Sequence, residues 1–234
     1  MSYSNYSSNQ SYERTSTNFM YKVYGWMSAG LLMTATTAYG VYANPPLFNA
    51  LIMNKVAFYM LLFAPIGLVL LLGAAINRMS FGVAAGVFTL YSCITGITLS
   101  TLFMAYTMES IYMVFALTSS MFFVMSVYGY LTNADLSSAG NLLIMGLWGI
   151  IISSFINIFM GSDTFQYIIS FIAVIIFTGL IAYDTQKIKH LGDQLAGQGQ
   201  PINKIALLGA LVLYLDFINL FLNLMYLLGN RRRD

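Results

Sequence analysis

Seven apolar stretches, each long enough to cross a lipid bilayer as a helix, decide what this chain can fold into. A transmembrane helix needs about 20 predominantly apolar residues. The stretches lie at roughly 20–43, 51–76, 81–106, 110–131, 140–160, 165–186 and 204–228. Only 8% of the residues are charged, whereas soluble domains carry about 25%. The pattern predicts an all-α integral membrane protein with seven transmembrane helices.

Polar residues gather at the chain ends and in the connections. Residues 1–18 are rich in Ser, Asn and Tyr, which predicts a disordered polar tail. Residues 19–230 then form one seven-helix membrane domain, and residues 231–234 form a basic carboxyl-terminal end. The connections are short, except for a Gly- and Gln-rich one near 187–203. Because none can hold a folded domain, we expect any activity to lie within the helices.

Composition narrows the chemistry further. The formal net charge of +2 gives no reason to expect a nucleic-acid partner, and the single cysteine, Cys93, excludes an internal disulfide framework. His190 is the only histidine and stands in the Lys-rich connection, where we expect it to be solvated. We therefore expect no cofactor, no structural metal and no enzymatic activity. Gly82 and Gly86 form a Gly-x-x-x-Gly pair, which predicts close helix packing.

The last apolar stretch contains a carboxylate near its middle, Asp216. Asn219 and Asn223 follow at i+3 and i+7, so that the three polar side chains share one face of the helix. An ionisable group at membrane depth is costly unless it is paired or hydrated, and it usually faces the interior of a helix bundle. We therefore expect the last helix to be central, with the other six helices around it.

The expected partner of Asp216 is Asp184, at the end of the sixth stretch. Two carboxylates in a low-dielectric site do not both ionise easily, so a pair in contact shares a proton. Arg78, at the end of the second stretch, can pair with ionised Asp184 and act as a latch. Our hypothesis is that acidification protonates the pair and opens a path, and that the ionised oxygens attract a hard cation such as Ca²⁺.

Two other interpretations remain open for these aspartates. In the first, each aspartate only forms hydrogen bonds with backbone or hydroxyl groups and fixes helix packing. The second is a diaspartyl intramembrane protease, whose first motif Tyr183-Asp184 matches. The second motif would need Gly-x-Gly-Asp, whereas Leu213-Tyr214-Leu215 precede Asp216. Depth is a further difficulty, because Asp184 lies near one membrane face and Asp216 about a dozen residues into its helix. At 1.5 Å per residue, that depth is about 20 Å.

Basic residues indicate the orientation, because they are enriched on the cytoplasmic side. The side of the amino terminus would hold Arg14, Lys22, Arg78, Lys187, Lys189 and Lys204. The opposite side would hold only Lys55 until Arg231, Arg232 and Arg233 at the end. The first set predicts a cytoplasmic amino terminus. With seven spans, the terminal arginines contradict it, unless their signal is overridden or one stretch is re-entrant.

Four stretches resemble the Bax inhibitor-1 family, also called the transmembrane Bax inhibitor motif proteins. They are Thr95–Ser100 (TGITLS), Ser126–Gly140 (SVYGYLTNADLSSAG), Ala182–Gln186 (AYDTQ) and Leu213–Phe221 (LYLDFINLF). The likeness covers nearly everything from about Phe19 to Gly229, and the last two stretches together are the most specific.

The resemblance implies seven helices with the last enclosed by the other six, and a pH-sensitive calcium leak gated at Asp184 and Asp216. An arginine that aligns approximately with Arg78 belongs to that gate in bacterial relatives. Some relatives have an acidic residue in the second span, where this chain has none and Gly67 lies near the equivalent place. The compact loops are typical of a bacterial inner-membrane member, although an organellar one is not excluded.

The resemblance also implies a second role, as a regulatory membrane protein that binds another membrane protein. Eukaryotic relatives restrain cell death, and some bacterial relatives bind and inhibit a membrane-anchored ATP-dependent protease. The expected partners are thus the lipid bilayer, Ca²⁺ as the permeant ion, and such a protease. A pull-down with and without residues 1–18 would separate the roles, because a leak should not need the tail.

Overall fold

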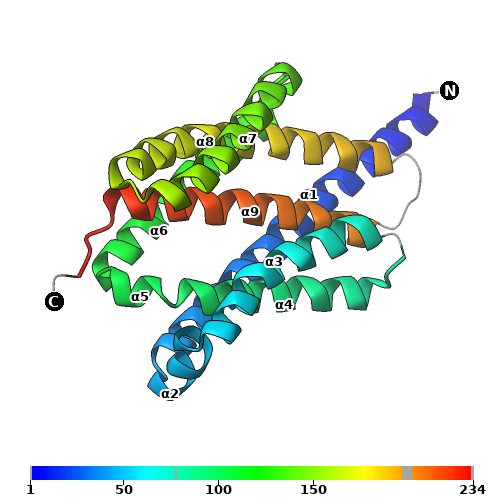
Figure 1. The fold of residues 1–234 in the computed structure, drawn as a ribbon. Helices are drawn as coiled ribbons and strands as arrows, with labels where there is room; N and C mark the ends of the chain where they lie inside the picture. The colour runs from blue at the N-terminus through cyan, green and yellow to red at the C-terminus, as the bar shows by residue number, and fades with distance from the viewer. Residues whose placement is uncertain (1, 77, 197–201, 233–234) are drawn as a thin grey trace. The chain divides into compact units, whose positions relative to one another are not determined.

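The computed structural model describes the backbone of residues 2–76, 78–196 and 202–232, and the side chains of these ranges apart from 2–16 and 196. The described residues are almost entirely helical and form no strand (Figure 1). The elements are α1 (Ser2–Tyr42), α2 (Pro45–Phe48), η1, a π-helix (Asn49–Met53), α3 (Lys55–Ala75), α4 (Phe81–Leu99), α5 (Leu102–Ala105), α6 (Met108–Leu131), α7 (Ser137–Met160), α8 (Asp163–Ala196) and α9 (Ile202–Leu228).

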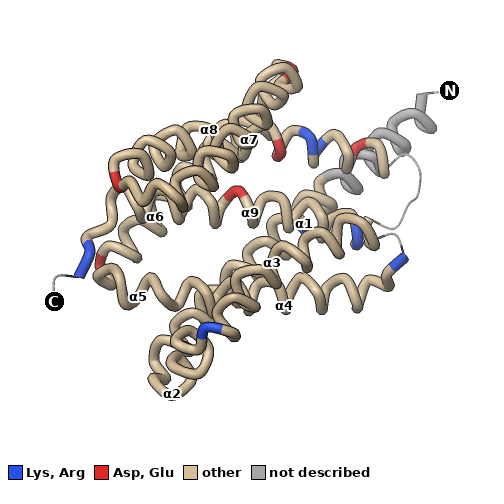
Figure 2. Tube along the Cα trace, viewed as in Figure 1, with Lys and Arg blue, Asp and Glu red and all other residues tan. Residues whose placement is uncertain are grey.

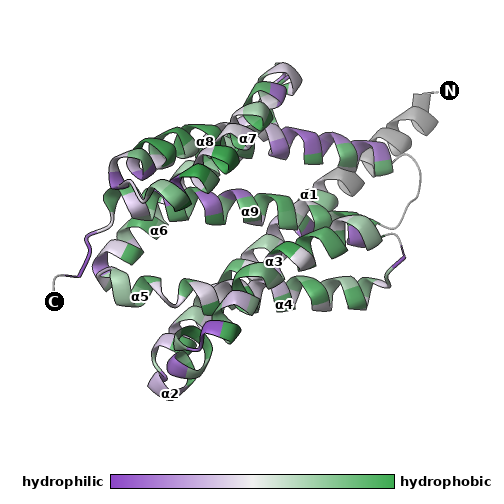
Figure 3. Ribbon diagram, viewed as in Figure 1, coloured by the Kyte–Doolittle hydropathy of each residue, from purple (hydrophilic) through white to green (hydrophobic). Residues whose placement is uncertain are grey.

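Six segments of the described chain are long and apolar enough to cross a membrane. They are α3, α4 with α5, α6, α7, α8 and α9. Figure 3 shows apolar residues along these helices and hydrophilic ones toward the carboxyl-terminal end of α8. Helix α1 is not among the six, because Gly, Thr and Tyr dilute its apolar half. The seventh span at 20–43 therefore stays a prediction, as does the enclosure of α9 by the other helices.

Polar caps set the helix boundaries. Asn54 accepts hydrogen bonds from the Val56 and Ala57 backbone N–H groups, so α3 begins at Lys55 rather than at residue 51. Ser80 caps α4 in the same way. Gly161 ends α7 with a positive φ of 62°, a conformation that favours glycine. Such caps matter because lipid offers no hydrogen bonds to open backbone groups.

The chain divides into two compact units, each described by itself. Unit 1 comprises residues 1–105 and 191–214, and unit 2 comprises residues 106–190 and 215–234. In unit 1, α4 packs against both α1 and α3. The buried Tyr214 of α9 lies in its core, with its hydroxyl 2.6 Å from Thr34 Oγ1 and its ring edge-on to Phe88 and Tyr91.

In unit 2, the last part of α9 packs against α6 through aromatic rings. Phe217 contacts Phe115 and Phe122, with ring centroids 5.5 and 5.7 Å apart, and Phe221 also contacts Phe115. Close backbone approach joins α8 to α6 and α7. A Cβ atom at Gly129 would collide with the Ala182 carbonyl, and one at Gly140 would collide with the Tyr183 ring. Only glycine fits at either place.

Helix α8 differs most from the sequence prediction. It continues to Ala196, ten residues beyond the predicted end at 186, because no proline interrupts it (Figure 1). Lys187, Lys189 and His190 therefore lie on a helix rather than in a loop, and His190 is exposed as expected. Residues 197–201, the remainder of the predicted connection, lie outside the described residues.

Two further expectations concern particular segments. Helix α1 begins at Ser2, where the composition predicted a disordered tail over 1–18, and no Gly or Pro interrupts the chain before Gly25. The side chains of 2–16, including Arg14, lie outside the description, as do Arg233 and Asp234. The packing prediction for Gly82 and Gly86 is wrong, since nothing lies within 4 Å of a Cβ built at either. In unit 1 a close contact falls at Gly96, where a Cβ would lie 2.6 Å from Thr34 O.

Candidate functional site

Asp184 and Asp216 meet in unit 2, and the length of α8 explains how. Asp184 lies twelve residues before the end of α8, and Asp216 lies fourteen residues after the start of α9. At 1.5 Å per residue, these offsets are about 18 and 21 Å. Helices that run in opposite directions from a shared end thus bring the two residues to nearly the same level. The depth difficulty disappears because α8 extends beyond its apolar part.

The two carboxyl groups lie close enough for a side-chain hydrogen bond between them. Carboxylate oxygens only accept hydrogen bonds, so a hydrogen bond between the two groups would need a proton on one of them. Asp216 is 5% exposed, and Asp184 is half-buried. Among the described residues, the Oδ2 atom of Asp216 has no hydrogen-bond partner although it is buried. The site therefore places two carboxyl groups within reach of one another and leaves Asp216 Oδ2 without a hydrogen-bond partner among the described residues.

The turn of α8 that carries Asp184 is held firmly on both sides. Tyr183 packs on Gly140 of α7, and Ala182 packs on Gly129 of α6. Thr185 donates a hydrogen bond of 3.4 Å to Ser126, also on α6. These contacts leave the backbone beside Asp184 little freedom to rotate. Their sequence signal was the small residues Gly129 and Gly140, but nothing in the sequence showed which neighbour each one meets.

Gln186 forms hydrogen bonds with the backbone of the connection between α6 and α7. Its Nε2 atom donates to Ala134 O over 2.8 Å, and its Oε1 atom accepts from Leu136 N over 2.9 Å. One side chain thereby satisfies two backbone groups of the connection, two residues along α8 from Asp184. Sequence analysis named Gln186 only as the last residue of the family stretch Ala182–Gln186 and gave it no role, because a single glutamine near an aspartate indicates no particular contact.

Lys187 and Lys189 lie on the same part of α8. The Lys187 ammonium lies 5.6 Å from the Tyr183 ring centroid, and its charge acts on Asp184. Lys189 donates to Tyr130 O over 2.8 Å and lies 4.8 Å from the Tyr130 ring centroid. Figure 2 shows how sparse the other charged residues are along the helices. A basic residue thus stands beside Asp184 within unit 2.

Arg78, the predicted latch, belongs to unit 1. It lies in the turn between α3 and α4, and its side chain is exposed. The aspartates belong to unit 2, so the latch stays a prediction.

Asn219 and Asn223 lie on α9 as predicted, one and two turns beyond Asp216, and both are half-buried. Each points its amide nitrogen at its own helix. Asn219 Nδ2 donates to Leu215 O over 2.8 Å, and Asn223 Nδ2 donates to Asn219 O over 2.8 Å.

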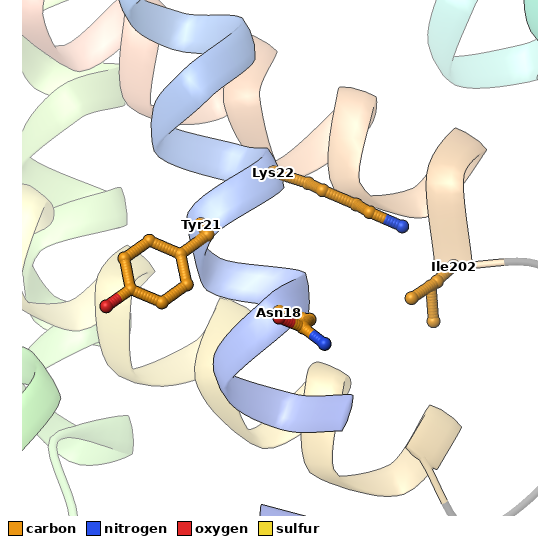
Figure 4. A pocket seen from close by; sticks show the side chains of 4 residues that line it. All are labelled: Asn18, Tyr21, Lys22 and Ile202. Carbon is orange, nitrogen blue, oxygen red and sulfur yellow. The ribbon is translucent and has the colours of Figure 1, made fainter. Parts of the chain in front are cut away.

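Other parts of the described chain offer weaker sites. No group of three or more His, Cys, Asp or Glu in these residues could hold a metal ion. A shallow pocket of about 370 Å³ in unit 1 is lined by Asn18, Tyr21, Lys22 and Ile202 (Figure 4). The Lys22 ammonium there donates to Asn203 over 2.7 Å. This pocket contains no carboxylate, so it is no candidate for proton or cation chemistry.

Comparison with known proteins assigns the family. A family model described as "Inhibitor of apoptosis-promoting Bax1" matches residues 16–233. "Inner membrane protein YbhL" of Escherichia coli strain K12 is 45% identical over 215 residues, which is 92% of each chain. A Borreliella burgdorferi protein is 45% identical over 216 residues (92% of this chain, 93% of the other), and a Rickettsia prowazekii protein is 39% identical over 226 (97% and 95%). The chain therefore belongs to the Bax inhibitor-1 family of membrane proteins.

Proposed function

We propose that this protein is a pH-sensitive cation leak channel that passes Ca²⁺, gated by the proton that Asp184 and Asp216 share. The observation that supports it is the close approach of the two carboxyl groups on two membrane helices, with the buried Asp216 Oδ2 left without a hydrogen-bond partner among the described residues. A buried polar atom without a partner is unusual in a folded protein and calls for an explanation. An ion or water that visits the pair explains it.

The gate follows from the charge of the pair. With one shared proton the pair carries one negative charge, which can attract a cation and pair with an arginine. Acidification adds a second proton and removes that charge, so the latch by the guanidinium of Arg78 weakens and the path opens. Arginine suits a latch because it stays charged at every relevant pH. Only the aspartates then change charge between the two states.

The proposed setting is a bacterial inner membrane with a cytoplasmic amino terminus. The inner-membrane name of the E. coli relative and the six membrane-spanning candidates support the membrane. The basic residues on the amino-terminal side support the orientation. The seventh span would be the apolar part of α1, and α9 would be the enclosed helix. Binding to a membrane-anchored protease stays a prediction.

Calcium flux into vesicles tests the site directly. The protein is reconstituted in liposomes that hold a calcium dye, and influx is compared at several pH values. We expect wild-type influx to rise on acidification, and Asp184→Asn and Asp216→Asn to lose that response. Glu109→Gln is the matched control, because Glu109 is an exposed carboxylate in the first turn of α6. Unaltered influx and pH response in both aspartate variants would exclude these residues as the gate.

A further inference from the structure

The amide groups of Asn219 and Asn223 have a fixed orientation. Each faces a backbone carbonyl four residues earlier in α9, and a carbonyl only accepts hydrogen bonds. The NH₂ group must therefore point toward the helix, which leaves each Oδ1 atom pointing away from that carbonyl. Among the described residues, no donor is bonded to either Oδ1 atom. Both are oxygen acceptors with unused capacity in a half-buried position.

These oxygens continue the line that begins at the aspartate pair. Residues 216, 219 and 223 are spaced i, i+3 and i+7, so they share one face of α9. Along the helix axis, Asn219 lies about 4.5 Å and Asn223 about 10.5 Å beyond Asp216. The first atom in the line, Asp216 Oδ2, is buried and lacks a partner among the described residues. Three oxygen-bearing side chains thus follow one another along a membrane helix without protein donors for these atoms.

The opposite side of the helix serves packing. Phe217 and Phe221 lie more than a quarter-turn round the helix from this face and pack edge-on against Phe115 and Phe122 of α6. The aromatic contacts therefore fix α9 through a face other than the one that carries the three oxygens.

We propose that Asp216 Oδ2, Asn219 Oδ1 and Asn223 Oδ1 form a row of oxygen sites, here called the α9 oxygen row, that passes a hard cation such as Ca²⁺ in single steps. This inference rests on the proposed leak function and names two residues that carry the ion beyond the gate. Carboxylate and amide oxygens are the ligands that hard cations prefer. A permeating ion needs sites that bind weakly enough to release it.

The row suits transit rather than storage. No group of three His, Cys, Asp or Glu side chains in the described residues could trap a metal ion, and two of the three ligands in the row are uncharged. Amide oxygens also do not titrate in the physiological range. The asparagines therefore set how fast cations pass, whereas the aspartates set the response to pH.

Two measurements test the row, the first of them vesicle calcium influx. In Asn219→Leu and Asn223→Leu, apolar side chains of similar size replace the amides. Initial influx should fall by roughly tenfold in each, the factor produced by about 1.4 kcal/mol of added barrier. The shape of the pH profile should stay that of wild type. Thr178→Val is the matched control, because Thr178 is bonded to Val174 O of its own helix over 2.6 Å, in the manner of the asparagines, but lies on α8. Its influx should equal wild type.

The second measurement is Tb³⁺ luminescence of the detergent-solubilised protein, with Tb³⁺ as a probe for hard-cation sites. Tyr226, three residues beyond Asn223, is the expected sensitiser. The signal at a given Tb³⁺ concentration should drop in Asn219→Leu and Asn223→Leu and persist in Thr178→Val. Thermal melting of each variant separates loss of the site from loss of the fold.

The outcomes distinguish the row from the leak. If the wild-type protein shows influx and both asparagine variants show the same influx, the row is overturned and the proposed leak stands. An asparagine-dependent Tb³⁺ signal without wild-type influx supports the row as a cation site and overturns the leak. If the wild-type protein shows no influx and no asparagine-dependent Tb³⁺ signal, both the row and the leak are overturned.

Discussion

At the scale of single residues, neighbouring hydroxyl groups in unit 1 differ in their bonding. Tyr214 is fully buried, and its hydroxyl meets Thr34 Oγ1 at 2.6 Å. Thr95 is 8% exposed, and its Oγ1 atom lies near the Tyr91 and Tyr214 hydroxyls but makes no hydrogen bond of ordinary length and angle with a described residue. Because a hydroxyl that makes no bond has none to lose, the two side chains should respond differently to removal of the oxygen.

We expect Tyr214→Phe to lower the free energy of unfolding by about 0.6–1.5 kcal/mol, the range for one hydrogen bond in membrane and soluble proteins. Thr95→Val keeps the shape of the side chain and should be neutral or stabilising. Reversible unfolding in mixed detergent measures both. If Thr95→Val loses as much stability as Tyr214→Phe, the Thr95 hydroxyl has a partner that the structure lacks, such as a bound water.

Asp184 and Asp216 could be recognised from the sequence as candidate site residues, because carboxylates inside apolar stretches are rare and are usually functional. Their pairing could be predicted, but the common depth that it needs could not, since that depends on where α8 ends. The orientation of the asparagine amides was equally hidden, because it depends on which carbonyl each side chain reaches. Sequence thus predicted the members of the site but not their geometry.

At the scale of helices, the contact of α7 with α8 positions the turn that carries Asp184. A Cβ at Gly140 would collide with the Tyr183 ring, whereas one at Gly149, further along α7, meets nothing within 4 Å. Gly140→Ala should therefore destabilise the protein by about 1–3 kcal/mol, as overpacking does. Gly149→Ala should be neutral or stabilise by up to about 1 kcal/mol through helix propensity.

Thermal unfolding of Gly140→Ala and Gly149→Ala, with vesicle influx as a second readout, checks this prediction. We expect altered influx only in Gly140→Ala, because only that change displaces Tyr183 and the adjoining Asp184. Equal stability of the two variants would mean that α7 and α8 are not in the close contact described.

The two hydrogen bonds of Gln186 lead to a separate prediction about local opening of the connection between α6 and α7. Gln186→Ala removes the acceptor of Leu136 N and the donor to Ala134 O. Amide hydrogen exchange should therefore accelerate in residues 134–137, as in a segment of lowered local stability. Gln194→Ala is the control, because Gln194 is exposed on the same helix. Unchanged amide exchange at Leu136 in Gln186→Ala would contradict the hydrogen bond between Leu136 N and Gln186.

Helix existence was predictable because the seven apolar stretches are local features of the chain. The length of α8 was not, because its last ten residues mix polar side chains and a glycine with scattered apolar ones and resemble a loop in composition. A helix continues through such residues when nothing interrupts it and when contacts hold it. Gly192 shows one such contact, since a Cβ there would lie 2.5 Å from the Phe19 ring.

At the scale of the whole molecule, the number of spans decides on which side each end lies. Six spans place both ends on one side of the membrane, whereas a seventh through α1 places them on opposite sides. We expect seven spans with a cytoplasmic amino terminus. In a Cys93→Ser background, Ser8→Cys and Asp234→Cys provide a single thiol at each end.

A membrane-impermeant maleimide applied to spheroplasts should label only the Asp234→Cys protein. After permeabilisation, both should react, which serves as the control for reactivity. Labelling of both proteins in intact spheroplasts, or of neither, would mean an even number of spans. Basic residues predicted this orientation from sequence, but Arg231–Arg233 oppose it, so charge alone does not decide the question.

The contact between the carboxyl groups of Asp184 and Asp216 can be measured directly by solid-state NMR. In protein labelled with ¹³C at the aspartate side chains and embedded in lipid, spin diffusion between carboxyl carbons reports which aspartates touch. The account predicts one cross-peak between the Cγ atoms of Asp184 and Asp216, absent from Asp184→Asn and from Asp216→Asn. No cross-peak between them in the wild-type protein would contradict it.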